Sequence, residues 1–466
     1  MTNALHPIFA ADAKAAAKAI PIWFVHKSNA ASLTRQLDAA GRAFLDASGF
    51  EPSPGRCALV PAKDGKLAAV LFGIEQPDAR TKNLFLPGTL ANLLPDGAYR
   101  FANAPHDARL AALAIALGGY NFTRYRKTKA RAIKLIAPDG VDAKELSAII
   151  DGVTLARDLV NTPANDLGPA ELETAARKVA RAHGAKLRVT AGRALEKQFP
   201  LIHIVGMGSP RAPRLIDFTW GKPSHPKVTL VGKGVCFDTG GLDIKPSSAM
   251  LNMKKDLGGA ATALALAHMI MARKLPVRLR VLVPAVENSI SGISFRPRDV
   301  FTSRKGITVE IGNTDAEGRL ILADALSLAD EEKPDLMIDF ATLTGAARVA
   351  LGPDIPPFFT DDDRLAASLM IAATAESDPL WRLPLWRPYE AMLDTKVADI
   401  NNAGAGGFAG SITAALFLAK FVEQAKAWVH FDIFAWTPAS KPGRPEGGEC
   451  QAARAIYALL CERYEQ

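Results

Sequence analysis

The stretch VRLRVLVPAV, residues 277–286, is the segment that decides the fold. It is a nearly continuous apolar run, which predicts a strand that is buried on both faces. Strand-like and helical stretches alternate on both sides of it. The expected strands lie at 227–232, 277–286, 306–311, 335–343 and 427–434, and the expected helices at 258–275, 317–331, 411–425 and 450–464.

This alternation predicts an α/β fold, because βαβ units build a mostly parallel central sheet with helices on both faces. A chain of 466 residues is also too long for one ordinary core. Its first part mixes short apolar runs with a helical stretch, as in a small α/β domain. We therefore expect an N-terminal α/β domain over 1–140, a connecting helix over 141–162 and a larger domain over 163–466.

Positive charge is concentrated at the N-terminal end of the chain. Residues 1–140 hold 18 Lys and Arg against 10 Asp and Glu, whereas the rest of the chain holds 38 of each kind. The peak is RYRKTKARAIK, residues 124–134. Such a module suits nucleic acid or an acidic partner, but no nucleic-acid-binding motif accompanies it. We therefore favour a solvated basic face, or a face turned to an acidic neighbour in an oligomer.

The cysteines indicate a reducing compartment. They are scattered and form no CxxC pair, which argues against a disulfide scaffold and a zinc–thiolate site. The chain also has no run of eighteen or more apolar residues. Its start lacks the basic and apolar regions of a secretory signal. We expect a cytoplasmic protein without a membrane-spanning segment.

Charged side chains follow the predicted strands, at the edge where ligands bind in open α/β sheets. They are Lys233, Asp238 and Lys245 after the first strand, Asp256 at the start of the next helix, and Asp315, Glu317 and Arg319 after the 306–311 strand. Taken singly, Asp256 and Glu317 are equally well explained as acids that a helix dipole favours. Four carboxylates in one buried crevice, however, would repel one another unless cations were present. A pair of divalent metals resolves this, since carboxylate sites suit Mg, Mn or Zn.

Other reactive groups offer no rival site. The chain has no HExxH motif, and His268, His430 and Cys236 are more simply explained as packing residues. The segments VGKG and DTGG invite a nucleotide-binding interpretation, but the P-loop pattern GxxxxGK[ST] is missing. Their glycines are better explained as tight turns that let backbone approach metal and substrate closely.

Several blocks of the chain resemble the cytosolic leucyl aminopeptidase family of two-metal exopeptidases. NTDAEGRL, residues 313–320, is similar to the family signature. Similar blocks occur in the family's order and spacing, namely LVGKGVCFDTGGLDIKP, MKKDLGGAAT, PAVENSISGISFRPRDVF and DFATLTGAA. The resemblance is strong over residues 150–440 and weak over 1–140. It implies a homohexamer whose subunits have a catalytic α/β/α domain and an N-terminal macro-like α/β domain.

The resemblance also implies functional residues, position by position. The metal ligands are Lys233, Asp238, Asp256, Asp315 and Glu317. Lys245 matches the lysine that polarises the scissile carbonyl, and Arg319 the arginine that holds a bicarbonate ion, the proposed general base. The residues that line the substrate site are Met253, Asn313, Thr342, Leu343 and Gly345.

The implied activity is hydrolysis of the N-terminal residue from peptides that have a free N-terminus. Two divalent metal ions per subunit, Mn or Zn ahead of Mg or Co, would activate a bridging water, and bicarbonate would move the proton to the leaving amine. A lysine ligand must be neutral although its free pKa is about 10.4. We therefore expect Lys233 to be deprotonated and Lys245 to stay charged.

Two points leave alternatives open. Asp243 stands where the family often has a serine. An extra acid two residues from Lys245 is expected either to shift the pKa of that lysine or to alter the metal preference. The less favoured alternative function is an aminopeptidase that also binds DNA, as a regulator, through the basic N-terminal domain. Arg124, Arg126 and Lys127 would then contact the phosphates.

Overall fold

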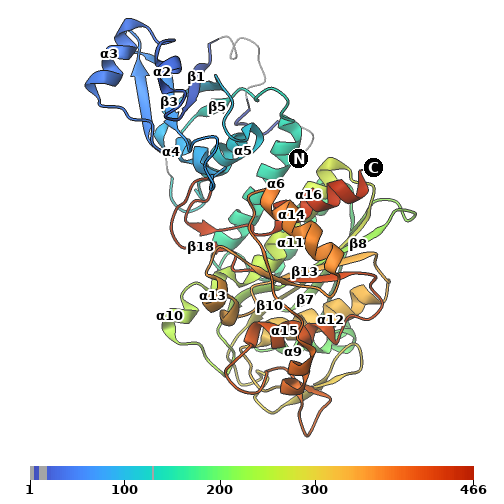
Figure 1. Ribbon diagram of the computed structural model, residues 1–466. Coiled ribbons are helices and arrows are strands. Elements are labelled where there is room, and N and C mark those ends of the chain that lie inside the picture. The colour runs from blue at the N-terminus through green and yellow to red at the C-terminus, as the bar shows by residue number, and fades with distance from the viewer. Residues whose placement is uncertain (1–4, 10–17, 128–130, 466) are drawn as a thin grey trace. The chain divides into compact units, whose positions relative to one another are not determined.

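A computed structural model of the protein describes residues 5–9, 18–127 and 131–465 (Figure 1). Residues 128–130 of the basic peak lie outside the described residues, as do residues 1–4 and 10–17 at the start of the chain, where no secretory signal is predicted. The chain divides into two compact units. The larger is drawn from Leu155–Pro438 and Gly447–Gln466, and the smaller from Asn3–Thr154 and Ala439–Glu446. The predicted domain limits at 140 and 162 stay a prediction.

The smaller unit is an α/β domain built on a five-stranded sheet of order β2-β3-β1-β4-β5. Its strands are β1 (Ile20–Val25), β2 (Cys57–Pro61), β3 (Leu67–Gly73), β4 (Gly97–Phe101) and β5 (Ile133–Leu135). Only the edge strand β2 runs antiparallel to its neighbour. The helices are α2 (Ala30–Thr34), α3 (Ala39–Ala47), η1 (Leu86–Thr89), α4 (Leu90–Leu93) and α5 (Ala108–Gly118). From Leu110 onward helix α5 is apolar all round and is accordingly buried.

The larger unit is organised by a nine-stranded sheet of order β15-β14-β17-β13-β8-β10-β7-β6, with β9 also paired to β10. The strands are β6 (Lys186–Ala191), β7 (Arg214–Trp220), β8 (Lys227–Gly232), β9 (Gly234–Asp238), β10 (Arg278–Asn288), β13 (Leu336–Ala341), β14 (Pro357–Phe359), β15 (Trp381–Arg382) and β17 (Trp428–Asp432). Strand β10 is buried from its second residue onward, as the apolar run at residues 277–286 predicts. It pairs in parallel with β8, and β8, β13 and β17 continue the parallel core, while β7 runs antiparallel to β10. The predicted α/β class is confirmed.

Helices cover both faces of this sheet (Figure 1). One layer consists of α7 (Pro169–Ala182), α11 (Gly258–Arg273), α14 (Asp363–Ala375) and α16 (Ala453–Tyr464). The other consists of α8 (Gly192–Gln198), α9 (Pro200–Gly206), α12 (Glu317–Asp330) and α15 (Gly410–Ala419). Short segments connect these elements, namely α10 (Ser247–Met250), η2 (Met253–Leu257), α13 (Gly345–Leu351) and η3 (Arg387–Leu393). Every residue of α12 is buried, because the helix lies between the sheet and α9 and α15.

One predicted strand does not belong to the central sheet. The 306–311 segment forms β12 (Thr308–Glu310), which joins β11 (Val300–Thr302) and β16 (Ile400–Asn401) in a separate three-stranded sheet. The run is short, and its hydrogen bonds go to the preceding β11 and to β16. Helix α6 (Ala143–Asn161) covers most of the predicted connector, and the division between the units falls within it. No helix among the described residues is long and apolar enough to cross a bilayer.

Candidate metal centre

Three carboxylates from different elements converge in the larger unit. Asp238 ends β9, Glu317 begins α12, and Asp315 lies in the loop before that helix. Each offers an oxygen within 4.8 Å of the others, and Asp238 and Glu317 are buried. The structure thus brings together acids that are up to 79 positions apart in the sequence.

Lys233 joins Asp256 to this group. It follows β8, and its Nζ lies 2.8 Å from Asp256 Oδ2 and 2.8 Å from Glu317 Oε1. The same Nζ donates a hydrogen bond of 2.9 Å to the carbonyl of Thr342, at the end of β13. Asp256 belongs to η2, directly before α11, and is buried. Lys245 lies at the more open side, with its Nζ 2.8 Å from Asp238 Oδ2 and also bound to Asp315 Oδ1.

The electrostatics of the cluster reflect crowded negative charge. Burial raises the pKa of Glu317 well above its ordinary value, and the neighbouring Asp238 adds to the shift. Burial and Asp238 likewise raise the pKa of Asp315 to about 6. Burial alone would lower the pKa of Lys233 and Lys245, but the surrounding carboxylates outweigh it and raise both. The neutral Lys233 that the family resemblance implies for a metal ligand stays a prediction.

The donor set fits divalent cations. Apart from their ion pairs with Lys233, Asp256 Oδ2 and Glu317 Oε1 are buried without a hydrogen-bond partner. Carboxylates as close together as Asp238, Asp315 and Glu317 repel one another when ionised, and a divalent cation bound between them offsets this repulsion. Carboxylates supplemented by an amine nitrogen suit Mn, Mg or Zn.

A glycine makes room for Lys233 in the cluster. A Cβ atom at Gly318 would lie 2.6 Å from Lys233 Cε and 2.8 Å from its Nζ, which is closer than side chains approach one another. A side chain at the position next to Glu317 would therefore displace the end of Lys233 from its present contacts with the two carboxylates.

Arg319 lies in α12 with an unpaired N–H group. Its Nη1 donates a 2.7 Å hydrogen bond to the carbonyl of Asn402, whereas its buried Nε has no partner. Burial lowers the pKa of Arg319 to about 10, so the guanidinium is still charged at neutral pH. A buried, charged N–H donor of this kind suits a small oxyanion.

The residues predicted to line the substrate site come from three segments. Met253 begins η2, Thr342, Leu343 and Gly345 lie where β13 leads into α13, and Asn313 lies in the loop before α12. The Thr342 hydroxyl donates to Asp256 Oδ1 at 2.7 Å. The Asn313 side chain accepts from the Asp315 N–H at 2.7 Å. Thr342 therefore contacts the Asp256 carboxylate directly, whereas Asn313 holds the backbone of Asp315.

Sequence reasoning missed three polar residues that organise the site. Asp432 accepts hydrogen bonds from the N–H groups of Leu343 and Thr344 at 3.0 and 3.1 Å. It ends β17, so the search for acids at strand ends would have found it. Asn288 and Asn402 bind backbone around the acids. Asn288 ends β10, so a search for polar residues at strand ends would have found it too, whereas no local pattern points to Asn402.

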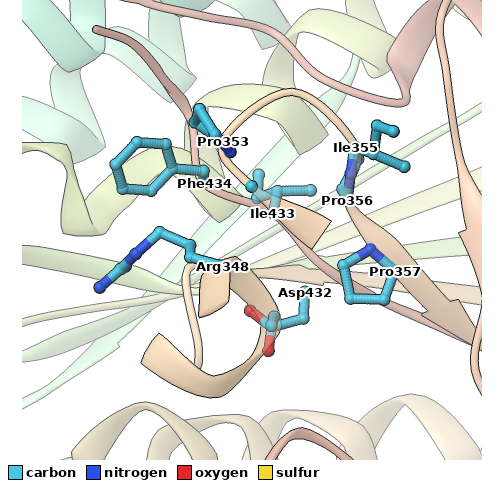
Figure 2. Close-up of a pocket in the computed structure, with 10 residues that line it drawn as sticks. Arg348, Pro353, Ile355, Pro356, Pro357, Asp432, Ile433 and Phe434 are labelled. Atoms are coloured by element: carbon cyan, nitrogen blue, oxygen red, sulfur yellow. The ribbon is translucent and has the colours of Figure 1, made fainter. Parts of the chain in front are cut away.

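A very small pocket, of about 10 Å³, lies between α13 and the segment that follows β17. In Figure 2, Arg348 and Phe434 lie side by side at one end and Pro357 lies at the other. The Arg348 guanidinium carbon is 4.8 Å from the centre of the Phe434 ring. None of the predicted catalytic, metal-binding or substrate-binding residues lines this pocket, so it is not the carboxylate site.

The histidines and Cys236 take up packing positions. His268 Nδ1 lies 3.1 Å from His183 Nε2, and burial lowers the pKa of His268 to about 4. His430 is fully buried, and its Nδ1 lies 2.6 Å from Asp339 Oδ1. Cys236 is buried in β9, and that burial raises its pKa well above the ordinary value.

Comparison with known families matches both parts of the chain. Residues 154–457 match the cytosol aminopeptidase family, catalytic domain, and residues 20–138 match the M17 aminopeptidase, N-terminal domain. A probable cytosol aminopeptidase of Rhizobium meliloti is 43% identical over 340 residues, covering 69% of this chain and 68% of the relative. One of Xanthobacter autotrophicus is 40% identical over 428 residues, covering 87% and 83%.

Solved structures agree with these matches. The cytosol aminopeptidase from Coxiella burnetii superposes with a TM-score of 0.91 at 46% identity, covering 96% of this chain and 97% of that one. The bottromycin maturation enzyme BotP in complex with Mn has a TM-score of 0.86 at 33% identity, covering 95% and 99%. The similarity therefore extends over both units of the fold.

Proposed function

Because this chain belongs to the cytosol aminopeptidase family and is a metal-dependent aminopeptidase, we propose that its carboxylate cluster holds two divalent cations that drive removal of N-terminal residues from peptides. The observation that carries this proposal is the convergence of Asp238, Asp315 and Glu317 within 4.8 Å. Lys233 and Asp256 complete the proposed ligand set. The Lys233 amine contacts both Asp256 and Glu317, which places the two residues next to the three carboxylates. Mn is favoured, with Zn next, and the related BotP structure contains Mn.

The residues of the chain have separate tasks in this proposal. When bound, the cations supply Lewis acidity that polarises the scissile carbonyl and lowers the pKa of a water molecule. Lys245 faces the open side of the cluster, where its ammonium would stabilise the negative charge that develops on the carbonyl oxygen. Met253, Asn313, Thr342, Leu343 and Gly345 would bind the substrate.

Arg319 is proposed to hold a bicarbonate ion. Its buried, unpaired Nε and its retained charge support this assignment. When bound, bicarbonate supplies a general base for the reaction. Replacing Arg319 should therefore lower kcat without removing the metal ligands.

The test is a panel of aminoacyl p-nitroanilides applied to metal-stripped protein that is reconstituted with Mn, Zn, Mg or Co. We expect release of p-nitroaniline only with metal, and none from N-acetylated versions of the same substrates. Equal rates on the acetylated substrates, or full activity after metal removal, would contradict the proposal.

We further propose a cytoplasmic homohexamer. Relatives named cytosol aminopeptidase support the location, and the resemblance to the family supports the hexamer. Light scattering coupled to size exclusion should give six times the chain mass. A monomer across the micromolar range would contradict this.

DNA binding by the basic segment is the second, less favoured candidate. Arg124, Arg126 and Lys127 are all exposed, which suits contacts with phosphates. Binding to a DNA duplex should then fall steeply with salt and be lost when all three are changed to Gln. Absence of binding at low salt would exclude this function.

A further inference from the structure

Side chains hold the central part of the loop between β12 and α12. Four successive backbone N–H groups, those of residues 312–315, donate to side-chain oxygens. The acceptors are Asn402 Oδ1 for Gly312 and Asn313, Asp243 Oδ2 for Thr314, and Asn313 Oδ1 for Asp315. Because backbone donors away from water need partners, these side chains determine the path of the loop. Asp243 is the only charged acceptor among them.

Asp243 and Thr314 bind each other reciprocally. The Thr314 N–H donates to Asp243 Oδ2 at 2.7 Å, and the Asp243 N–H donates to Thr314 Oγ1 at 2.8 Å. The Thr314 hydroxyl donates to the carbonyl of Gly240 at 2.6 Å. Gly240 and Gly241 have φ values of +89° and +66°, which lets the chain turn back toward Thr314.

This pair fixes the position of Asp315 relative to Asp238. The Thr314 carbonyl accepts from Asn288 Nδ2 at 3.1 Å, and the same Nδ2 donates to Asp238 Oδ1 at 2.9 Å. Thr314, the residue before Asp315, is therefore held by Asp243 at its N–H and by Asn288 at its carbonyl. Thr314 is fully buried, so its N–H has no ready replacement for the Asp243 oxygen.

We propose that Asp243 is a positioning residue that holds the Asp315 carboxylate in place by accepting the Thr314 N–H. This inference rests on the proposed function, because it takes Asp315 to be a metal ligand. The hydrogen bond, and not the negative charge, does the positioning. The acid that departs from the family pattern thus supports the site instead of altering Lys245.

The test compares three variants. Asp243→Ala removes the acceptor, whereas Asp243→Asn keeps an amide oxygen that can accept from Thr314 but removes the charge. Asp399→Ala is a matched control, because Asp399 forms the same reciprocal pair with Thr308. Its Oδ2 accepts from the Thr308 N–H at 2.8 Å, and its N–H donates to Thr308 Oγ1 at 2.9 Å, outside the carboxylate cluster.

Two readouts are needed, namely kcat and KM on a leucyl p-nitroanilide at saturating Mn, and Mn affinity of metal-stripped protein by calorimetry. For Asp243→Ala we expect kcat to fall by about 10- to 100-fold with little change in KM, and the weaker Mn binding event to lose about tenfold in affinity. Asp243→Asn should stay within about threefold of the wild type, and Asp399→Ala should match it.

Three outcomes would overturn the inference. Asp243→Ala could behave as the wild type, Asp243→Asn could lose as much as Asp243→Ala, or Asp399→Ala could lose as much as Asp243→Ala. A wild-type protein without Mn-dependent activity would instead refute the proposed function. In that case the Mn affinities of the variants still decide whether Asp243 positions the Asp315 carboxylate. Thermal unfolding of each variant shows whether a loss comes from unfolding.

Discussion

Replacing Gly318 by Ala is the sharpest perturbation of the cluster that the structure offers. The new methyl group would lie 2.6 Å from Lys233 Cε, whereas non-bonded carbon atoms approach to about 3.5–4.0 Å. Lys233 must therefore move by about 1 Å, since α12 is buried on all sides. Its Nζ, now 2.8 Å from both Asp256 and Glu317, would leave hydrogen-bonding distance of at least one of them.

The expected result is a large loss of activity with a small change in stability. A displacement of about 1 Å in an active site lowers the rate by about 100-fold, which is about 2.7 kcal/mol. Alanine favours helix over glycine by up to about 1 kcal/mol, while overpacking costs about 1–3 kcal/mol. We therefore expect unfolding free energy to fall by no more than about 2 kcal/mol.

The assay is kcat/KM on a leucyl p-nitroanilide with saturating Mn, together with urea unfolding. Gly292→Ala is the matched control, because a Cβ there meets no atom within 4 Å. We expect it to keep wild-type activity. A Gly318→Ala enzyme within twofold of the wild type would refute the idea that the contacts of Lys233 matter for catalysis.

Three other perturbations have defined outcomes. The two carboxylate oxygens of Asp324 accept from the backbone N–H groups of Leu201 and Arg304. In Asp324→Asn the amide NH₂ must face one of these donors, so the unfolding free energy should fall by about 1–3 kcal/mol. An unchanged midpoint of urea unfolding would contradict this. Burial lowers the pKa of His268 from about 6.5 in the unfolded chain to about 4 in the folded protein. The unfolded chain therefore binds a proton more readily, and the protein loses stability as the pH falls from 6.5 toward 4. His268→Leu should therefore reduce acid destabilisation between pH 6.5 and 4 by up to about 3 kcal/mol, whereas an unchanged pH profile of unfolding would count against it. Arg319→Gln should lower kcat by about 100-fold and remove any response of the rate to added bicarbonate. Mn binding measured by calorimetry should stay unchanged. A retained bicarbonate response would contradict the role of Arg319.

Much of the fold was predictable because its strongest signals are local. The apolar run at 277–286 gives β10 at the centre of the sheet, and the leucine-rich pattern after NTDAEGRL gives α12. The 306–311 strand was assigned to the wrong sheet, because partner choice for β12 depends on residues near position 400. Three-residue strands have too few contacts for their sequence to specify a partner.

The candidate site was predictable only where acids stand next to an element boundary. Asp238, Asp315 and Glu317 occupy such boundaries and do converge. The amides of Asn288 and Asn402 act on segments 26 and 89 positions away, so no spacing in the sequence reveals them. The sequence indicates only that Asp243 stands where the family often has a serine. Its reciprocal hydrogen bonds with Thr314 are visible only in the structure.

The most direct test of the metal centre is Mn binding and peptide hydrolysis measured together on metal-stripped protein, wild type and Glu317→Gln. The wild type should bind two Mn ions per chain and release the N-terminal leucine from a leucyl peptide only as both are filled. Glu317→Gln should lose binding and activity in parallel. If Glu317→Gln bound two Mn ions with unchanged affinity and hydrolysed the peptide at the wild-type rate, the carboxylate cluster would not be the catalytic metal centre.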